Sequence, residues 1–113
     1  PEKLLETAAR ALGEYLYGPA GDGRDEEVRT VIEGTEELDR FVAALNEALY
    51  LLQQRRLRIR EVFLAEAPGK WRLTFLTESA PRPPLTEIKA ATYNEAVLKR
   101  EGEGWTAEIT FDL

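Results

Sequence analysis

Residues 36–75, EELDRFVAALNEALYLLQQRRLRIREVFLAEAPGKWRLTF, contain a change of hydrophobic period that decides the fold class. Apolar residues in the first half recur every three or four positions, which is typical of an amphipathic helix. They are Leu38, Phe41, Val42, Leu45, Leu49 and Leu52. From Leu57 to Phe75, apolar and polar residues alternate on both sides of Pro68-Gly69, which predicts a β-hairpin. A helix followed by antiparallel strands indicates an α+β fold.

The sequence before this stretch predicts one more helix and one more strand. Residues 2–16 carry apolar side chains at helical spacing, Tyr15 among them, and residues 27–33 are rich in β-forming residues. One face of that strand would carry Val28, Thr30 and Ile32. Thr35 is expected to cap the second helix, because its hydroxyl can accept a hydrogen bond from a free N–H of the first turn.

The sequence after the hairpin predicts two further strands. Residues 81–84, PRPP, form a connection, because proline cannot donate the hydrogen bonds of a strand ladder. Strands are expected over 88–100, interrupted near Asn94, and over 105–112, joined by a turn at 101–104. The expected fold is therefore two helices packed against a largely antiparallel β-sheet, in a single domain with one core.

Composition excludes several kinds of chemistry. The 113 residues include no cysteine and no histidine, which excludes disulfides, thiolate zinc sites and imidazole catalysis and leaves mainly carboxylate chemistry. With 15 Lys and Arg against 21 Asp and Glu, the net charge is −6. This charge disfavours direct nucleic-acid binding and suits a basic protein partner. No apolar run is long enough for a bilayer span, so we expect a soluble, cytoplasmic protein without membrane contact.

The carboxyl-terminal residues resemble a known family. Residues 87–93, EIKAATY, are followed by Gly104-Trp105 and by a terminal ITFDL at 109–113, and together they are similar to the signature of the archease family. Residues 45–52, LNEALYLL, resemble the second helix of that family. The resemblance implies an archease-like α+β fold. Because archeases carry an amino-terminal strand with an H-T-A-D motif, we expect that strand to be missing before Pro1.

The resemblance also implies a function. Archeases are non-enzymatic, chaperone-like accessory proteins of the GTP-dependent tRNA-splicing RNA ligase, and they promote its guanylylation and multiple turnover in tRNA splicing or RNA repair. Their acidic cluster binds a divalent cation, calcium or magnesium. At the matching positions this chain has Asp112 and the terminal carboxylate of Leu113, which would be two of the metal ligands.

Other positions depart from the family pattern or support it less directly. Gly18 stands where the family carries a second aspartate, with Asp22 and Asp25 nearby, and Asn94 replaces a histidine. The further candidates for metal or partner contacts are Asp22, Asp25, Lys89, Thr92, Tyr93 and Asn94. Cross-strand packing is the alternative for Thr92 and Tyr93. The alternative functions are an archease-fold interaction module that has lost the metal site and, less favoured, a hydrolase with paired carboxylates.

Overall fold

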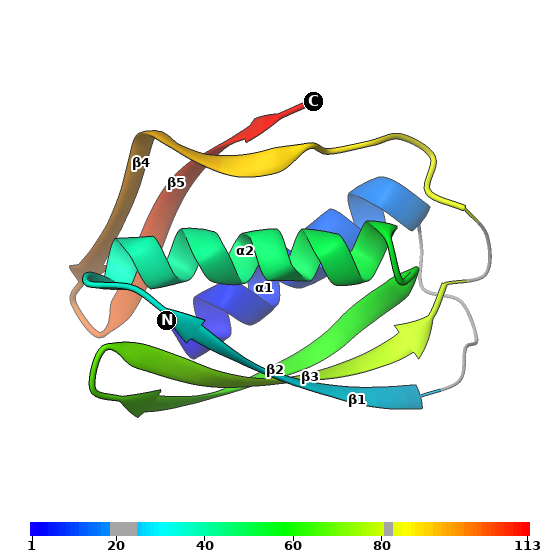
Figure 1. The fold of residues 1–113 in the computed structure, drawn as a ribbon. Coiled ribbons are helices and arrows are strands. Elements are labelled where there is room, and N and C mark those ends of the chain that lie inside the picture. Colours follow the sequence, from blue (N-terminus) through cyan, green and yellow to red (C-terminus); the bar gives the residue numbers. More distant parts are fainter. Residues whose placement is uncertain (19–24, 81–82) are drawn as a thin grey trace.

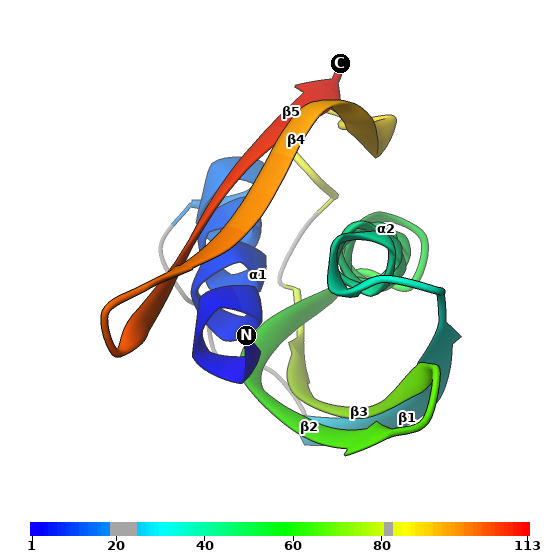
Figure 2. The same ribbon diagram turned by 90° about the vertical axis from the view of Figure 1, so that its left-hand side faces the viewer.

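The protein consists of two β-sheets with two helices between them (Figures 1 and 2). The computed structural model describes residues 1–18, 25–80 and 83–113. The elements in chain order are α1 (Glu2–Tyr17), β1 (Asp25–Glu33), α2 (Glu37–Gln53), β2 (Leu57–Ala67), β3 (Lys70–Ser79), β4 (Ala90–Glu101) and β5 (Gly104–Asp112). The α+β class is confirmed, and the predicted strands are all present within a few residues of their expected bounds.

The strands form two sheets, whereas the sequence analysis predicted one. The first sheet has the order β1-β3-β2, the second contains β4 and β5, and all pairings are antiparallel. The chain leaves β3 at Ser79, and the N–H of Leu85 then donates to the carbonyl of Leu16 at the end of α1 at 2.7 Å. Because this connection passes the helix ends, β4 begins on the opposite side of the helices (Figure 1).

The core lies where both helices face the first sheet, and its largest fully buried side chains include Trp71, Phe41 and Phe75. Most of the predicted apolar positions of α2 are buried, and Ile32 is the buried member of the β1 face. Tyr15 is an exception, because it is 53% exposed although its spacing placed it on the apolar face of α1. The aromatic residue that α1 buries is Tyr17, whose hydroxyl donates to the carbonyl of Leu52.

The start of α2 also differs from the prediction. Its N-cap is Glu36 and not Thr35. The Glu36 carboxylate accepts the N–H of Asp39, and the Asp39 carboxylate accepts the N–H of Glu36 at 3.2 Å. This reciprocal capping box satisfies two N–H groups that have no partner within the helix, which a single threonine hydroxyl could not do.

Tyr17 makes stability depend on pH in the alkaline range. Burial raises its pKa above the ordinary 10.0, and Arg56 and Arg58 partly oppose this effect. The folded protein therefore binds the phenol proton more tightly than the unfolded chain. The contribution of protonated Tyr17 to the free energy of unfolding is complete below about pH 10 and is lost as pH rises through the folded-state pKa. We expect the free energy of unfolding of wild type, relative to that of Tyr17→Phe, to fall between pH 9 and pH 12 in urea titrations. A constant difference would contradict this assignment.

No helix among the described residues is long and apolar enough to cross a membrane.

Candidate functional site

The end of β5 presents one acidic side chain to solvent and packs its neighbours inward. Ile109 and Phe111 are half-buried against the core, whereas Glu108, Thr110 and Asp112 are exposed. This alternation is that of a regular strand, because successive side chains of a strand point to opposite faces. Asp112 therefore directs its carboxylate away from the molecule.

The main chain of Asp112 is held although its side chain is free to contact a partner. Asp112 lies opposite Ala90 in the β4–β5 ladder, and its carbonyl accepts the N–H of Lys89 at 2.7 Å. Leu113 follows with 71% of its surface exposed. We call Asp112 and the end of the chain at Leu113 the acidic tip. Backbone hydrogen bonds fix the position of Asp112 in this tip, and contacts of its carboxylate do not.

Two of the predicted neighbours, Lys89 and Thr92, lie beside this tip. Lys89 is exposed, and Thr92 pairs with Thr110 in the ladder. The Thr92 hydroxyl oxygen is buried and has no hydrogen-bond partner among the described residues. Lys89 and Thr92 flank Ala90, the residue opposite Asp112, so the strand pairing brings the three predicted residues together.

Tyr93 and Asn94 lie in an irregular part of β4. The ladder pairs Thr92 with Thr110 and then Val97 with Glu108, so residues 93–96 bulge out of register. Glu95 in this bulge has a φ of 56°, in the left-handed region. Tyr93 is 55% exposed, and its hydroxyl donates to the carbonyl of Asp39 at 3.4 Å. Tyr93 therefore contacts the start of α2 and not the Asp112 carboxylate.

The structure places Asp25 away from this tip. Asp25 begins β1 in the three-stranded sheet, on the other side of the helices from β5 (Figure 1). Its carboxylate forms an ion pair with Arg60 at 2.8 Å. Gly18 follows α1, and its carbonyl accepts a hydrogen bond from Arg58 at 2.7 Å. Asp22 lies outside the described residues.

The described residues do not complete a cation site. Calcium binds six to eight oxygen ligands, and magnesium requires an octahedral set. Within residues 1–18, 25–80 and 83–113, no three Asp, Glu, His or Cys side chains come close enough together to hold a metal ion. Asp112 and the end of the chain at Leu113 would supply only part of the required coordination.

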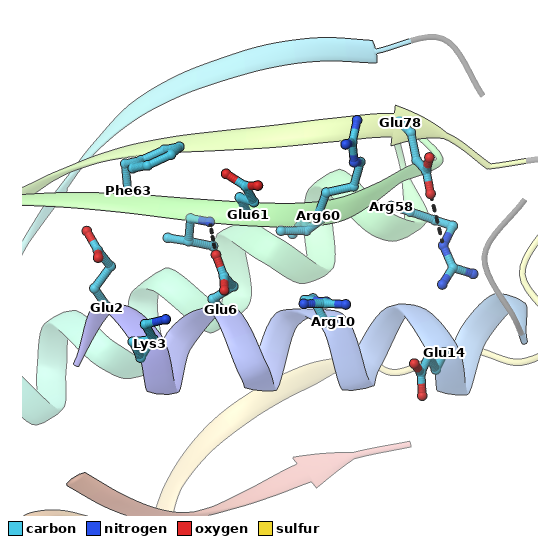
Figure 3. Close-up of a pocket in the computed structure, with 12 residues that line it drawn as sticks. Glu2, Lys3, Glu6, Arg10, Glu14, Arg58, Arg60, Glu61, Phe63 and Glu78 are labelled. Carbon is cyan, nitrogen blue, oxygen red and sulfur yellow. Dashed lines mark hydrogen bonds and ion pairs between the residues drawn. The ribbon is translucent and has the colours of Figure 1, made fainter. Parts of the chain in front are cut away.

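A groove lies elsewhere, between α1 and β2, and has a volume of about 800 Å³ (Figure 3). Acidic and basic side chains line it in nearly equal numbers, and three of its carboxylates already have partners. Glu78 forms an ion pair with Arg58 at 3.8 Å. Glu6 accepts the N–H of Val62 at 2.9 Å, and Glu2 accepts the N–H of Leu64 at 2.7 Å. These two glutamates satisfy N–H groups at the outer edge of β2, so we assign them a structural role.

Two residues near the acidic tip were missed by the sequence analysis. Asn46 and Gln53 of α2 hydrogen-bond through their amide groups to the backbone of Ala91 and Ile88. The available signal was a pair of amide residues about two turns apart on one amphipathic helix. That pattern alone does not indicate which backbone the amides would contact.

Comparison with known proteins identifies the family. A model of the "Archease protein family (MTH1598/TM1083)" matches residues 1–113. The chain belongs to the archease family. "Protein archease" of Methanosarcina barkeri is 25% identical over 120 residues, and that of Methanosarcina acetivorans is 26% identical over 121. Each alignment covers 99% of this chain and 82% of the relative.

Solved archease structures share the fold. A crystal structure of a Thermotoga maritima archease, described as a possible chaperone, superposes with a TM-score of 0.65 at 21% identity over 100% of this chain and 84% of that one. The solution structure of Methanobacterium thermoautotrophicum protein 1598 gives 0.66 at 18% identity, over 99% of this chain and 84% of that one. The archease-like fold expected from the sequence is therefore confirmed.

Proposed function

We propose that this archease is a non-enzymatic activator of the cytoplasmic GTP-dependent tRNA-splicing RNA ligase, promoting guanylylation of the ligase and its repeated turnover in tRNA splicing or RNA repair. The observation that carries the proposal is the acidic tip: an exposed Asp112 carboxylate whose backbone is fixed by Lys89. Among the residues that the structure describes, this carboxylate has no hydrogen-bond or ion-pair partner, so it is placed to act on another molecule.

The net charge of the chain favours a protein partner that itself binds RNA. The chain carries a net charge of −6, and an enzyme that binds RNA and GTP presents basic surfaces to both. Complementary potentials accelerate encounter and set the orientation of the complex. The acidic tip would then reach the basic nucleotide site of the ligase, while direct binding of this chain to RNA is disfavoured by repulsion.

A turnover assay with the cognate ligase tests the proposal. We expect the protein to increase both the rate of ligase guanylylation in a single turnover and the number of RNA joints formed per enzyme. Because the encounter is electrostatic, the stimulation should weaken as salt rises from 50 to 500 mM. If neither quantity changes at low salt, the activator assignment is wrong.

A second function is favoured by the position of Asp25. This residue, a candidate ligand, is paired with Arg60 on the opposite sheet from Asp112. The alternative is therefore an interaction module of archease fold that works without a cation of its own. Calorimetric titration with calcium and magnesium separates the two functions. Heat of binding that Asp112→Ala abolishes favours a cation-dependent activator. Stimulation of the ligase without such heat favours the interaction module that needs no cation.

A further inference from the structure

Two amide side chains of α2 pair with the backbone that leads into β4. Gln53 donates to the carbonyl of Ile88 at 2.7 Å and accepts the N–H of Ile88 at 2.8 Å. Asn46 donates to the carbonyl of Ala91 at 3.1 Å and accepts the N–H of Ala91 at 2.7 Å. Each amide thus satisfies both polar groups of a single backbone residue, as the residue of a neighbouring strand would do.

The two amides bind the same side of the segment that leads into β4. Asn46 and Gln53 lie about two helical turns apart and therefore on the same side of α2. The backbone from Ile88 to Ala91 runs along that side of the helix (Figure 1). At Ala91, which lies in β4 opposite Phe111 of β5, the Asn46 amide takes the place of a third strand, and Gln53 does the same for Ile88 just before β4. Ile88 and Ala91 are buried, so their carbonyl and N–H groups would otherwise lack partners.

The backbone that the two amides bind, residues 88–91, also holds the acidic tip. Between Ile88 and Ala91 lie Lys89, whose N–H donates to the Asp112 carbonyl at 2.7 Å, and Ala90, which lies opposite Asp112 in the ladder. We infer that Asn46 and Gln53 are positioning residues for the acidic tip: they fix residues 88–91 against α2 and thereby fix Asp112. The expected effect of these residues on ligase stimulation rests on the proposed function, whereas their effect on the position of Asp112 does not.

The chemistry of the amide group provides the test. An amide can donate and accept at the same time, whereas a carboxylate of the same shape can only accept. Asn46→Asp and Gln53→Glu therefore keep the bond from the backbone N–H and place a carboxylate oxygen against the backbone carbonyl. Gln54→Glu is the matched control, because Gln54 is exposed, adjacent in sequence and subject to the same change of charge at the end of α2.

Hydrogen exchange of the Lys89 amide, followed by NMR on the full chain at pH 7, measures how firmly Asp112 is held. We expect this amide to exchange about tenfold faster in Asn46→Asp and in Gln53→Glu than in wild type, and at the wild-type rate in Gln54→Glu. Lowering the pH to about 4 protonates about half of ordinary carboxyl groups and restores a donor in that fraction. The ratio of variant to wild-type rates should then return toward one, which general destabilisation would not produce.

Ligase stimulation supplies the second measurement. In the turnover assay we expect Gln53→Glu and Asn46→Asp to lose stimulation by about fivefold or more, and Gln54→Glu to keep it. An unchanged Lys89 exchange rate in both amide variants overturns the inference, as does full stimulation by variants whose Lys89 amide exchanges faster. If wild type itself fails to stimulate the ligase, the proposed function fails, while the exchange rates still decide whether the two amides hold Asp112.

Discussion

Replacing Asp112 with alanine is expected to reduce ligase stimulation by at least about tenfold, because removing one partner of a close charge pair across an interface costs 2–5 kcal/mol or more. The same change should leave the fold intact. The side chain is exposed, and the backbone bond from Lys89 to the Asp112 carbonyl does not depend on it. Thermal unfolding should therefore shift by no more than about 2 °C, as for other surface substitutions.

The comparison variants separate charge from shape and position. Asp112→Asn keeps the shape of the side chain and removes its charge. It should therefore behave like the alanine variant if the partner recognises the charge. Glu108→Ala removes a carboxylate from the same exposed face of β5, opposite Val97 and further from the tip, and should stimulate like wild type. Full stimulation by Asp112→Ala would mean that the acidic tip is not the contact with the ligase.

The sequence predicted the fold class because helical and strand periods are local properties. The change of period after Arg56 located the end of α2 and the start of β2, and the strand predicted over 105–112 is confirmed by β5. The resemblance to archeases at residues 87–113 then indicated the family, which the match over the whole chain confirmed. The predictions of helices and strands depended on neighbours within a few residues, and the family resemblance on a motif near the end of the chain.

Apart from Tyr15, the features that the sequence did not predict concern contacts between residues distant in the chain or competition between adjacent ones. Nothing local separates β4 and β5 from the first sheet, because that separation arises from the path between Ser79 and Ala90 past the end of α1. The pairing of Asp25 with Arg60 and the bonds from α2 to residues 88–91 are equally long-range. Thr35 and Glu36 were both reasonable caps, and the reciprocal bonds with Asp39 favour Glu36.

The largest loss of stability is expected for Trp71→Ala. Trp71 is 1% exposed, lies opposite Ile32 in the β1–β3 ladder and packs under the guanidinium group of Arg40 at 5.4 Å from the ring centre. Removing a buried indole costs about 3–5 kcal/mol through lost burial and the cavity left behind. Since domains of this size are stable by only about 5–15 kcal/mol, urea denaturation should show a greatly lowered midpoint or an unfolded variant at 37 °C.

Trp105 provides the control, because it is the second tryptophan of the chain and is only half-buried, at the start of β5. Trp105→Ala should cost roughly half as much as Trp71→Ala, since the transfer term scales with the apolar area removed from water. Equal losses would mean that β4 and β5 are as essential to the core as the first sheet. Ligase stimulation by Trp71→Phe, which keeps an aromatic ring in the core, should remain near wild type at 25 °C, because the acidic tip is held by β4 and α2 and not by Trp71.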